Sequence, residues 1–578
     1  MTKALTTFLG GQHDNVSPEY LDDSEYALGV NGVNRNGHWQ TRPDIVEQVS
    51  LPAGRFQGVF SFRDDLYAVI SGLIYKGPDF LSTEPVEGVS LSSLARQVYA
   101  TETEYHLVLS DGVGNVVAVG DYSNRRLGDR ELNHIGLLCY GQGRIFFTDK
   151  ERLTLQAGDI YIPGEPDSVL GITEQAFLNE NLSIRQPAAL GRINAMEFMR
   201  ADTGTGVGLL MVFHEYGIAA YNFSTPRAGQ GDTPGWLDSS LGQLILWHEG
   251  AGGPRSVVQI NNDLIYRDAT GVTTLRNSVS NAQQGLRSLP ISMPVSNTLR
   301  RAAAWTLDYV SGSAQNNRIL YTHGLRVDGH GDFYFDTLVS LDLASFYSRG
   351  ETQMTWDGIW TGHKFLQVMP SRWQGRSATI VVTKQRDNGN TLCTLSTQAL
   401  AEAPRTRVYT KRLFFGDTAF VLAKLQHFEI WLENIKSDTG LKVYFKGDSP
   451  FWFLAGEGTF KVPYYTSEAG NGATIHPQQR SKITLSFNST TCDPSTLAEI
   501  TRSGFFQFCI EHTGSAEISR MLFVPKPPLN NDDGKTLLCE EPDTGSVLTS
   551  TTAGVYLYEY DELDQSYYSL EDASVHYF

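Results

Sequence analysis

The chain has 578 residues, of which 41% are hydrophobic and 11% aromatic, so it has enough apolar material for several buried cores and is not a disordered segment. Charged residues make up only 19%, and the formal net charge is −18, which argues against a surface that grips nucleic acid through clustered Lys and Arg. No run approaches ~18 uninterrupted apolar residues, and no secretory leader is recognisable at the start, so we expect no membrane span. A chain with so few charges and so many aromatic residues is expected to bury surface in an oligomer.

The cysteines are odd in number and scattered, without a CxxC pair, which predicts reduced thiols in a protein that folds in a cytoplasm. They are Cys139, Cys393, Cys492, Cys509 and Cys539.

Short runs rich in Val, Ile, Phe, Tyr and Thr, bounded by Gly, Asn or Asp, follow one another from residue 56 to residue 400 and predict β-strands. Six of them resemble one another, at 65–70, 115–119, 143–149, 216–222, 262–267 and 331–336. Hairpins repeated every ~40–70 residues are typical of propeller blades, so we expect a β-propeller over 56–400, preceded by an N-terminal segment, 1–55, that leads into it. The irregular spacing leaves the number of blades open, and an irregular set of sandwiches is the alternative fold. Short helices are expected only within 163–181 and after Asp493.

The length and residue pattern of the predicted strands change near residue 400. Longer strands with period-two alternation lie at 407–415, 423–434, 441–446, 482–487, 504–510 and 516–523. This pattern predicts a β-sandwich over 401–525, with one face of each sheet buried. The fold class is therefore all-β, a β-propeller followed by a β-sandwich platform domain.

The remaining residues, 526–578, are predicted to be a linker and an acidic C-terminal tail. From Thr536 to Phe578 there are nine carboxylates, no Lys and no Arg, so this stretch supplies half of the net charge. It also holds seven aromatic residues, whereas a purely solvating acidic tail should be poor in them. We interpret it as an assembly segment.

Motifs that would indicate catalysis or a cofactor are missing from the sequence: it has no GxSxG, HExxH or P-loop pattern and no His/Cys cluster with zinc spacing. We therefore expect no enzyme, no cofactor and no metal. A propeller can host a glycosidase site built from two opposed carboxylates, but no pair stands out. The small basic spots at 124–126, 300–301 and 405–407 fit either protein contacts or solvated surface.

Three patches resemble the tail nozzle (tail hub, or tail tubular B-type) proteins of short-tailed bacteriophages. The first runs from SPEYL at 17–21 through ALGVN at 27–31 to NRNGHWQTRP at 34–43. The second joins NDLIYR at 262–267 to GLRSL at 285–289. The third comprises KRLFFGD at 411–417 and GFFQF at 504–508, similar to the sandwich module of phage tail proteins. Together they cover about a tenth of the chain.

The resemblance implies a structural virion protein that is made in the host cytoplasm and resides in the virion tail. Such proteins form a homohexameric ring below the portal–adaptor ring, in contact with tail spikes, fibres or a needle or plug. The ring is a conduit and gate for double-stranded DNA, which passes without a specific grip. The net negative charge further predicts an electronegative lumen that repels phosphates.

Assembly and interface candidates come from the first patch and from the acidic tail. They are Trp39, Arg42, Pro43, Tyr556, Tyr558, Tyr560, Tyr567 and Tyr568. Two other functions stay open at this point, a propeller glycosidase or lyase and a receptor-binding adhesin, each acting on the bacterial surface.

Overall fold

The computed structural model describes residues 3–526 apart from short internal gaps and the longer segments 174–183, 200–207, 224–243, 280–289, 344–354, 397–404, 415–422, 461–477 and 487–501. The chain divides into two compact units. The propeller unit comprises Ile45–Val339 and Gly362–Leu395, and the sandwich unit comprises Met1–Asp44, Ser340–Thr361 and Ser396–Phe578. Nearly all regular structure in the described residues is β-strand, as the alternation of the sequence predicts, so the all-β fold class is confirmed.

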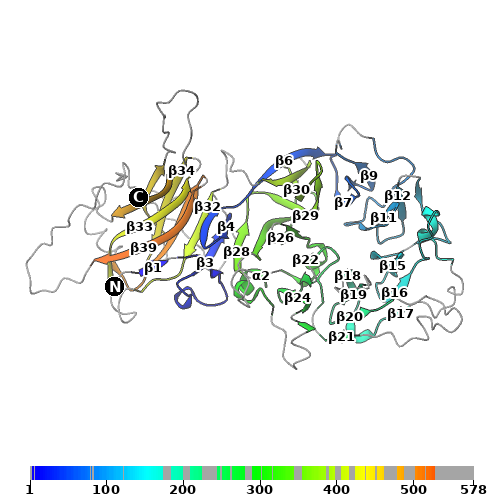
Figure 1. Ribbon diagram of the computed structural model, residues 1–578, viewed down its shortest axis with the longest axis horizontal. Coiled ribbons are helices and arrows are strands. Elements are labelled where there is room, and N and C mark those ends of the chain that lie inside the picture. The colour runs from blue at the N-terminus through cyan, green and yellow to red at the C-terminus, as the bar shows by residue number, and fades with distance from the viewer. Residues whose placement is uncertain are drawn as a thin grey trace, which may run out of the picture. The chain divides into compact units, whose positions relative to one another are not determined.

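Seven antiparallel meanders follow one another in the propeller unit and form a ring of blades (Figure 1). Blade 1 consists of β7 (Phe56–Phe62), β8 (Asp65–Ile70) and β9 (Leu73–Lys76). Blade 2 consists of β10 (Tyr99–Glu102), β11 (His106–Ser110), β12 (Val116–Gly120) and β13 (Asn124–Arg126). Blade 3 consists of β14 (Leu138–Gly141), β15 (Arg144–Thr148), β16 (Thr154–Ala157) and β17 (Ile184–Arg185). Blades 4 and 5 are β18 (Ile193–Met199), β19 (Leu209–His214), β20 (Ile218–Tyr221) and β21 (Leu244–Leu246); and β22 (Val257–Ile260), β23 (Asp263–Arg267) and β24 (Val272–Thr274). Blades 6 and 7 are β25 (Gly312–Gln315), β26 (Arg318–Val327) and β27 (Phe333–Asp342); and β29 (Lys364–Trp373), β30 (Arg376–Lys384), β31 (Asn390–Ser396) and β6 (Asp44–Leu51).

Strand β6 closes the ring. It precedes blade 1 in the chain but is hydrogen-bonded to β31, the last propeller strand, so blade 7 is built from both ends of the unit. Apolar clusters fill the spaces between adjacent blades, and one of them joins Val59 and Ala68 of blade 1 to Leu366 and Ile380 of blade 7. Both faces of a blade are apolar, so each blade needs a neighbour on either side.

Two-residue turns set the hairpin register in several blades. Gln142 and Gly143, between β14 and β15, both have positive φ, as do Gln374 and Gly375 between β29 and β30. Paired positive φ values define the type I′ turn, whose twist matches that of the flanking strands. Glycine at the second turn position adopts this conformation without steric cost.

The sandwich unit has two sheets. In the first sheet the strand order is β36 (Gln478–Ser486), β33 (Ala423–Ile435), β39 (Glu517–Lys526), β5 (His38–Thr41) and β4 (Gly32–Arg35). In addition, β1 (Lys3–Leu5) pairs with β39, and β37 (Arg502–Ser503) pairs with β33. In the second sheet the strand order is β35 (Phe453–Phe460), β34 (Thr439–Lys446), β38 (Gln507–Thr513), β32 (Thr406–Thr410), β3 (Glu25–Val30) and β28 (Thr355–Trp360). In addition, β2 (Gly11–Gln12) pairs with β3. A single apolar core draws residues from both sheets, among them Trp39, Phe428, Val443, Phe508 and Phe523.

Two predicted boundaries need correction. Residues 1–44 do not lead into the propeller, because they supply β1–β5 to the sandwich unit, and only β6 belongs to the propeller. The stretch 340–361, expected inside the propeller, supplies β28 to the sandwich unit. The unit boundary at Ser396 lies close to the predicted change at residue 400, whereas the predicted tail, from Pro527 on, lies outside the described residues.

Helices in the described residues are short, and they include η1 (Pro18–Tyr20), η2 (Pro166–Leu170), η5 (Ala188–Leu190), η6 (Met293–Val295), α2 (Ser296–Leu299) and η7 (Ala304–Tyr309). Of the two expected helical stretches, 163–181 contains η2, and the segment directly after Asp493 lies outside the described residues. In the part of the chain that the structure describes, no helix has the length and apolarity that crossing a membrane requires.

Replacement of Trp39 by Ala should lower the free energy of unfolding by about 3–5 kcal/mol, the usual loss for a buried aromatic side chain. Trp39 is fully buried and packs edge-on against Tyr26 with ring centroids 5.1 Å apart. Urea denaturation followed by circular dichroism measures the change. The matched control is Trp247→Ala, since Trp247 is 68% exposed. Equal effects of the two substitutions would contradict the assignment of Trp39 to the core.

Candidate functional site

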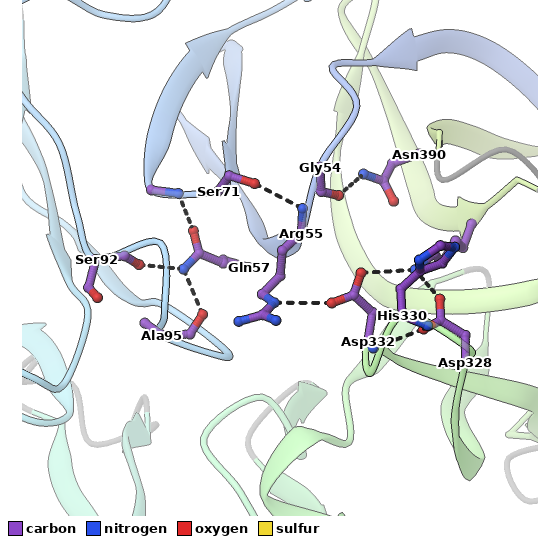
Figure 2. Close-up of polar contacts among 12 residues, drawn as sticks. Gly54, Arg55, Gln57, Ser71, Ser92, Ala95, Asp328, His330, Asp332 and Asn390 are labelled. Atoms are coloured by element: carbon purple, nitrogen blue, oxygen red, sulfur yellow. Dashed lines mark hydrogen bonds and ion pairs between the residues drawn. The ribbon is translucent and has the colours of Figure 1, made fainter.

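An ionic cluster joins blades 1, 6 and 7 of the propeller unit (Figure 2). Arg55, just before β7, donates from Nε to Asp332 Oδ1 at 3.0 Å. Lys384, the last residue of β30, donates from Nζ to Asp332 Oδ2 at 3.1 Å and also to Asp328. Asp328 and Asp332 lie in the turn between β26 and β27, and the backbone amides of His330 and Asp332 both donate to Asp328 Oδ1 at 2.9 Å. The turn is therefore tied to both of its neighbouring blades.

The charges of this cluster are matched. Burial opposes ionisation of Asp328, but the Lys384 ammonium and the two backbone amides outweigh it and lower the pKa of Asp328 to about 2. The Lys384 side chain is only 5% exposed and the Asp328 side chain 9%. With this pKa the Asp328 carboxylate stays ionised at all physiological pH values and cannot serve as a general acid.

A second polar contact crosses the middle of the ring. Arg255 precedes β22 in blade 5, yet its Nη2 donates to the backbone oxygens of Gln57 in blade 1 (3.0 Å) and Val98 beside blade 2 (2.7 Å). Its Nη1 donates to Gln367 Oε1 in blade 7 at 3.2 Å. Burial lowers the pKa of Arg255 to about 10, so the guanidinium remains charged at neutral pH. This side chain links blade 5 to three blades on the other side of the ring.

Arg152, between β15 and β16 of blade 3, also makes polar contacts with other parts of the propeller unit. It donates from Nη1 to Asp308 Oδ1 at 3.0 Å and also to the Tyr99 hydroxyl of blade 2. Beside the ionic cluster lies a cavity of only about 30 Å³, lined by Arg55, Arg96 and Lys384 among others. That volume holds about one water molecule. The polar contacts of Arg255 and Arg152 therefore hold the blades together, and the cavity beside the ionic cluster is too small for a substrate.

A larger groove, of about 1180 Å³, lies on blade 3 and the loop before it. Three of its five carboxylates are engaged: Asp159 Oδ2 accepts from the backbone amide and hydroxyl of Thr173, and Glu131 pairs with Arg125. Asp167 Oδ1 lies 3.0 Å from His106 Nε2. These three acidic side chains are thus held by the protein's own groups.

The structure places two of the predicted interface residues inside the sandwich unit, so their assignment to an exposed interface is not supported. Trp39 is fully buried in the core, and Arg42 is only 3% exposed. Arg42 donates to Asn31 Oδ1 and to the backbone oxygens of Pro43 and Thr361, and burial lowers its pKa to about 10. Pro43 is half-buried. The other five candidates, Tyr556, Tyr558, Tyr560, Tyr567 and Tyr568, lie outside the described residues.

Two of the three basic spots form ion pairs within their own units. Arg125 pairs with Glu131 and Asp167, and Arg407 Nε lies 2.7 Å from Glu511 Oε2. Three cysteines, Cys139, Cys393 and Cys509, are free and buried. Burial raises the pKa of Cys393 to about 11 and that of Cys509 to about 12, so these thiols are unreactive.

The contacts at the ring centre have no recognisable signal in the sequence. Arg55, Arg152 and Arg255 are isolated in the chain, and their partners lie far away in sequence. Only the turn motif around Asp328, with its following Gly and Asp, was recognisable as a local feature. Within the described residues, no group of three or more His, Cys, Asp or Glu side chains is arranged to hold a metal ion.

Comparisons with known proteins give a fold-level likeness only. No family model matches the chain, and no curated protein matches it. Similar solved structures include BBS1N in complex with ARL6DN (6% identity, TM-score 0.35, 62% of this chain and 99% of that chain) and BamB from Moraxella catarrhalis (8%, 0.32, 62% and 99%). Hsv2 of Kluyveromyces lactis is a third (11%, 0.30, 63% and 95%). Likenesses this distant carry no information about function.

Replacement of Lys384 by Met should destabilise the protein by about 3–5 kcal/mol, because it removes the cation that pairs with the largely buried Asp328 carboxylate, whereas Asp332 keeps its ion pair with Arg55. The control is Lys76→Met, which breaks an ion pair with Asp65 in which the two side chains are 51% and 41% exposed, and should cost at most about 1 kcal/mol. Thermal and urea unfolding of both variants measure the difference. A loss no larger than that of the control would show that the cluster contributes little.

Acidification should destabilise the sandwich unit through His512. Burial lowers the pKa of His512 to about 4, while its unfolded value is 6.5. The unfolded state therefore binds a proton first, so stability is intact above pH 6.5 and falls by up to about 3 kcal/mol as the pH drops to 4. Urea midpoints measured across this interval should vary less with pH in His512→Asn. Replacement of the exposed His330 is the control, and an unchanged slope in His512→Asn would refute the assignment.

Proposed function

We propose that this protein is a structural subunit of the tail nozzle of a short-tailed bacteriophage. In this proposal six copies form a ring below the portal–adaptor ring. The ring retains the genome and then conducts it during ejection. Tail spikes, fibres or a needle or plug are the expected further partners, and the protein is made in the host cytoplasm before it joins the virion tail.

The observation that carries the proposal is the presence, in one chain, of a closed propeller and a β-sandwich. The sequence resemblance implies these two modules for nozzle proteins. The contacts at the propeller centre, through Arg255, Lys384 and Arg152, are structural ones and fit a subunit that serves as a rigid wall.

Charge supports the same role. A ring of six chains, each with a net charge of −18, would surround the genome with a repulsive wall if its lumen shares that sign. DNA then passes without phosphate contacts that would slow it.

The glycosidase alternative needs two opposed carboxylates that are free to act on a sugar. In the blade 3 groove, Glu131 and Asp159 already accept hydrogen bonds or ion pairs from the protein. No observation favours the adhesin alternative over the nozzle. Assembly is therefore the function that we carry forward.

Mass photometry of the purified protein tests the proposal. The expected result is a species near six times 64.0 kDa, either alone or on particles that carry a portal and adaptor. Trimers would instead favour the adhesin. A monomer under every condition, together with release of reducing sugar from bacterial envelopes, would overturn the proposal in favour of an enzyme.

A further inference from the structure

An exposed patch of aromatic and arginine side chains lies beside the ionic cluster of the propeller unit. We call it the axial patch and define it by Arg96, Trp305, Tyr309 and Phe333. Trp305 is 57% exposed, and Arg96 is exposed as well. The Phe333 ring lies 5.8 Å from that of Trp305 and 4.8 Å from that of Tyr309, centroid to centroid. The Arg96 guanidinium lies over the Phe333 ring at 4.3 Å.

The segments that form the patch are far apart in sequence. Arg96 lies between blades 1 and 2, Trp305 and Tyr309 belong to η7 before blade 6, and Phe333 begins β27. Their convergence is fixed by the closed ring, so the patch is a preorganised surface. Preorganisation lowers the entropic cost of binding.

The patch and its surroundings carry a positive balance of charge. Arg96 shares its cavity with Arg55, Lys384 and Asp332, and Asp328 lies beneath Lys384. These are three cations against two carboxylates, in a chain whose net charge is −18. In the described part of the chain, Arg96 has no carboxylate partner, whereas Arg55 and Lys384 do.

Trp, Tyr and Arg are the residue types that dominate binding hot spots, and contiguous exposed apolar side chains mark interaction sites. A matching ligand would bring aromatic side chains for Trp305 and carboxylates for Arg96. The stretch Thr536–Phe578 has seven aromatic residues, nine carboxylates and no Lys or Arg. It alternates Tyr556, Tyr558 and Tyr560 with Leu557 and Glu559, so an extended strand would present the three tyrosines on one face.

We propose that the axial patch of one copy binds the acidic aromatic segment Thr536–Phe578 of a second copy. The segment is long enough to do so: the 52 residues after Lys526 span up to ~170 Å when extended. This inference requires only that two copies meet, so it stands or falls separately from the phage-tail proposal.

Hydroxyl-radical footprinting of the full-length protein provides the first test, with oxidation of Trp305 read by mass spectrometry. Trp305 should oxidise slowly at high protein concentration. It should oxidise several-fold faster after dilution, or after Tyr556→Ser, Tyr558→Ser and Tyr560→Ser are combined. Trp247, which is 68% exposed, is the internal control and should not change. Equal oxidation of Trp305 in both proteins, or protection that persists on dilution, would overturn the proposal.

A labelled peptide of residues 553–578 provides the second test, by fluorescence anisotropy against dilute full-length protein. Arg96→Glu should weaken its binding about tenfold or more, as loss of a hot-spot charge does. The exposed Arg376 of blade 7 gives the matched control, Arg376→Glu, which should bind normally. A peptide in which Ser replaces the three tyrosines should also bind weakly. No binding of the native peptide, or equal binding by both arginine variants, would refute the site.

Discussion

Burial of both faces of every blade is the constraint on which the propeller depends. The space between blades 1 and 2 is filled by residues such as Val69 and Leu107, and that between blades 7 and 1 by Leu366 and Val59. A blade at the end of an open series would expose one of these faces to water. The free-energy cost of that exposure is about 25 cal/mol per Å² of apolar area. The chain avoids this by hydrogen-bonding β6 to β31, which brings the first and last strands of the unit into one blade.

Closure also determines where polar groups can act. Because the blades surround a common centre, polar side chains that point towards it are buried and need hydrogen-bond partners there. Arg255 and Arg152 reach across to other blades, and Gln367 exchanges hydrogen bonds with the backbone of Val59. These contacts fix the blades relative to one another, and they occupy a centre that in other proteins could hold a ligand. The remaining opportunities for binding lie on the surface of the ring.

The sandwich unit depends on contacts between segments that are remote in sequence. Trp39 comes from the first 44 residues, Phe428 and Phe523 come from beyond residue 396, and all three share one core. The chain thus leaves the sandwich unit to build most of the propeller and returns to complete it.

Local patterns predicted the strands well, and long-range pairing marks the limit of sequence reasoning. Asp65–Ile70 is β8 as expected, because a short apolar run and a following Ser-Gly turn are local signals. The pairing of β6 with β31 joins segments more than 300 residues apart, and the sequence of Asp44–Leu51 does not indicate which strand it pairs with. For the same reason the sequence suggests Trp39 as an interface candidate, although the residue lies in the core. Arg96 was missed because its only notable feature is the ring of Phe333 beneath it.

We propose that six copies of this two-unit chain form one ring and that the axial patch is a surface at which copies meet. Electron microscopy of the purified protein, with class averages computed without imposed symmetry, tests this most directly. The account predicts rings with sixfold symmetry around an open centre. Solitary particles at every concentration, or rings of another symmetry, would contradict it.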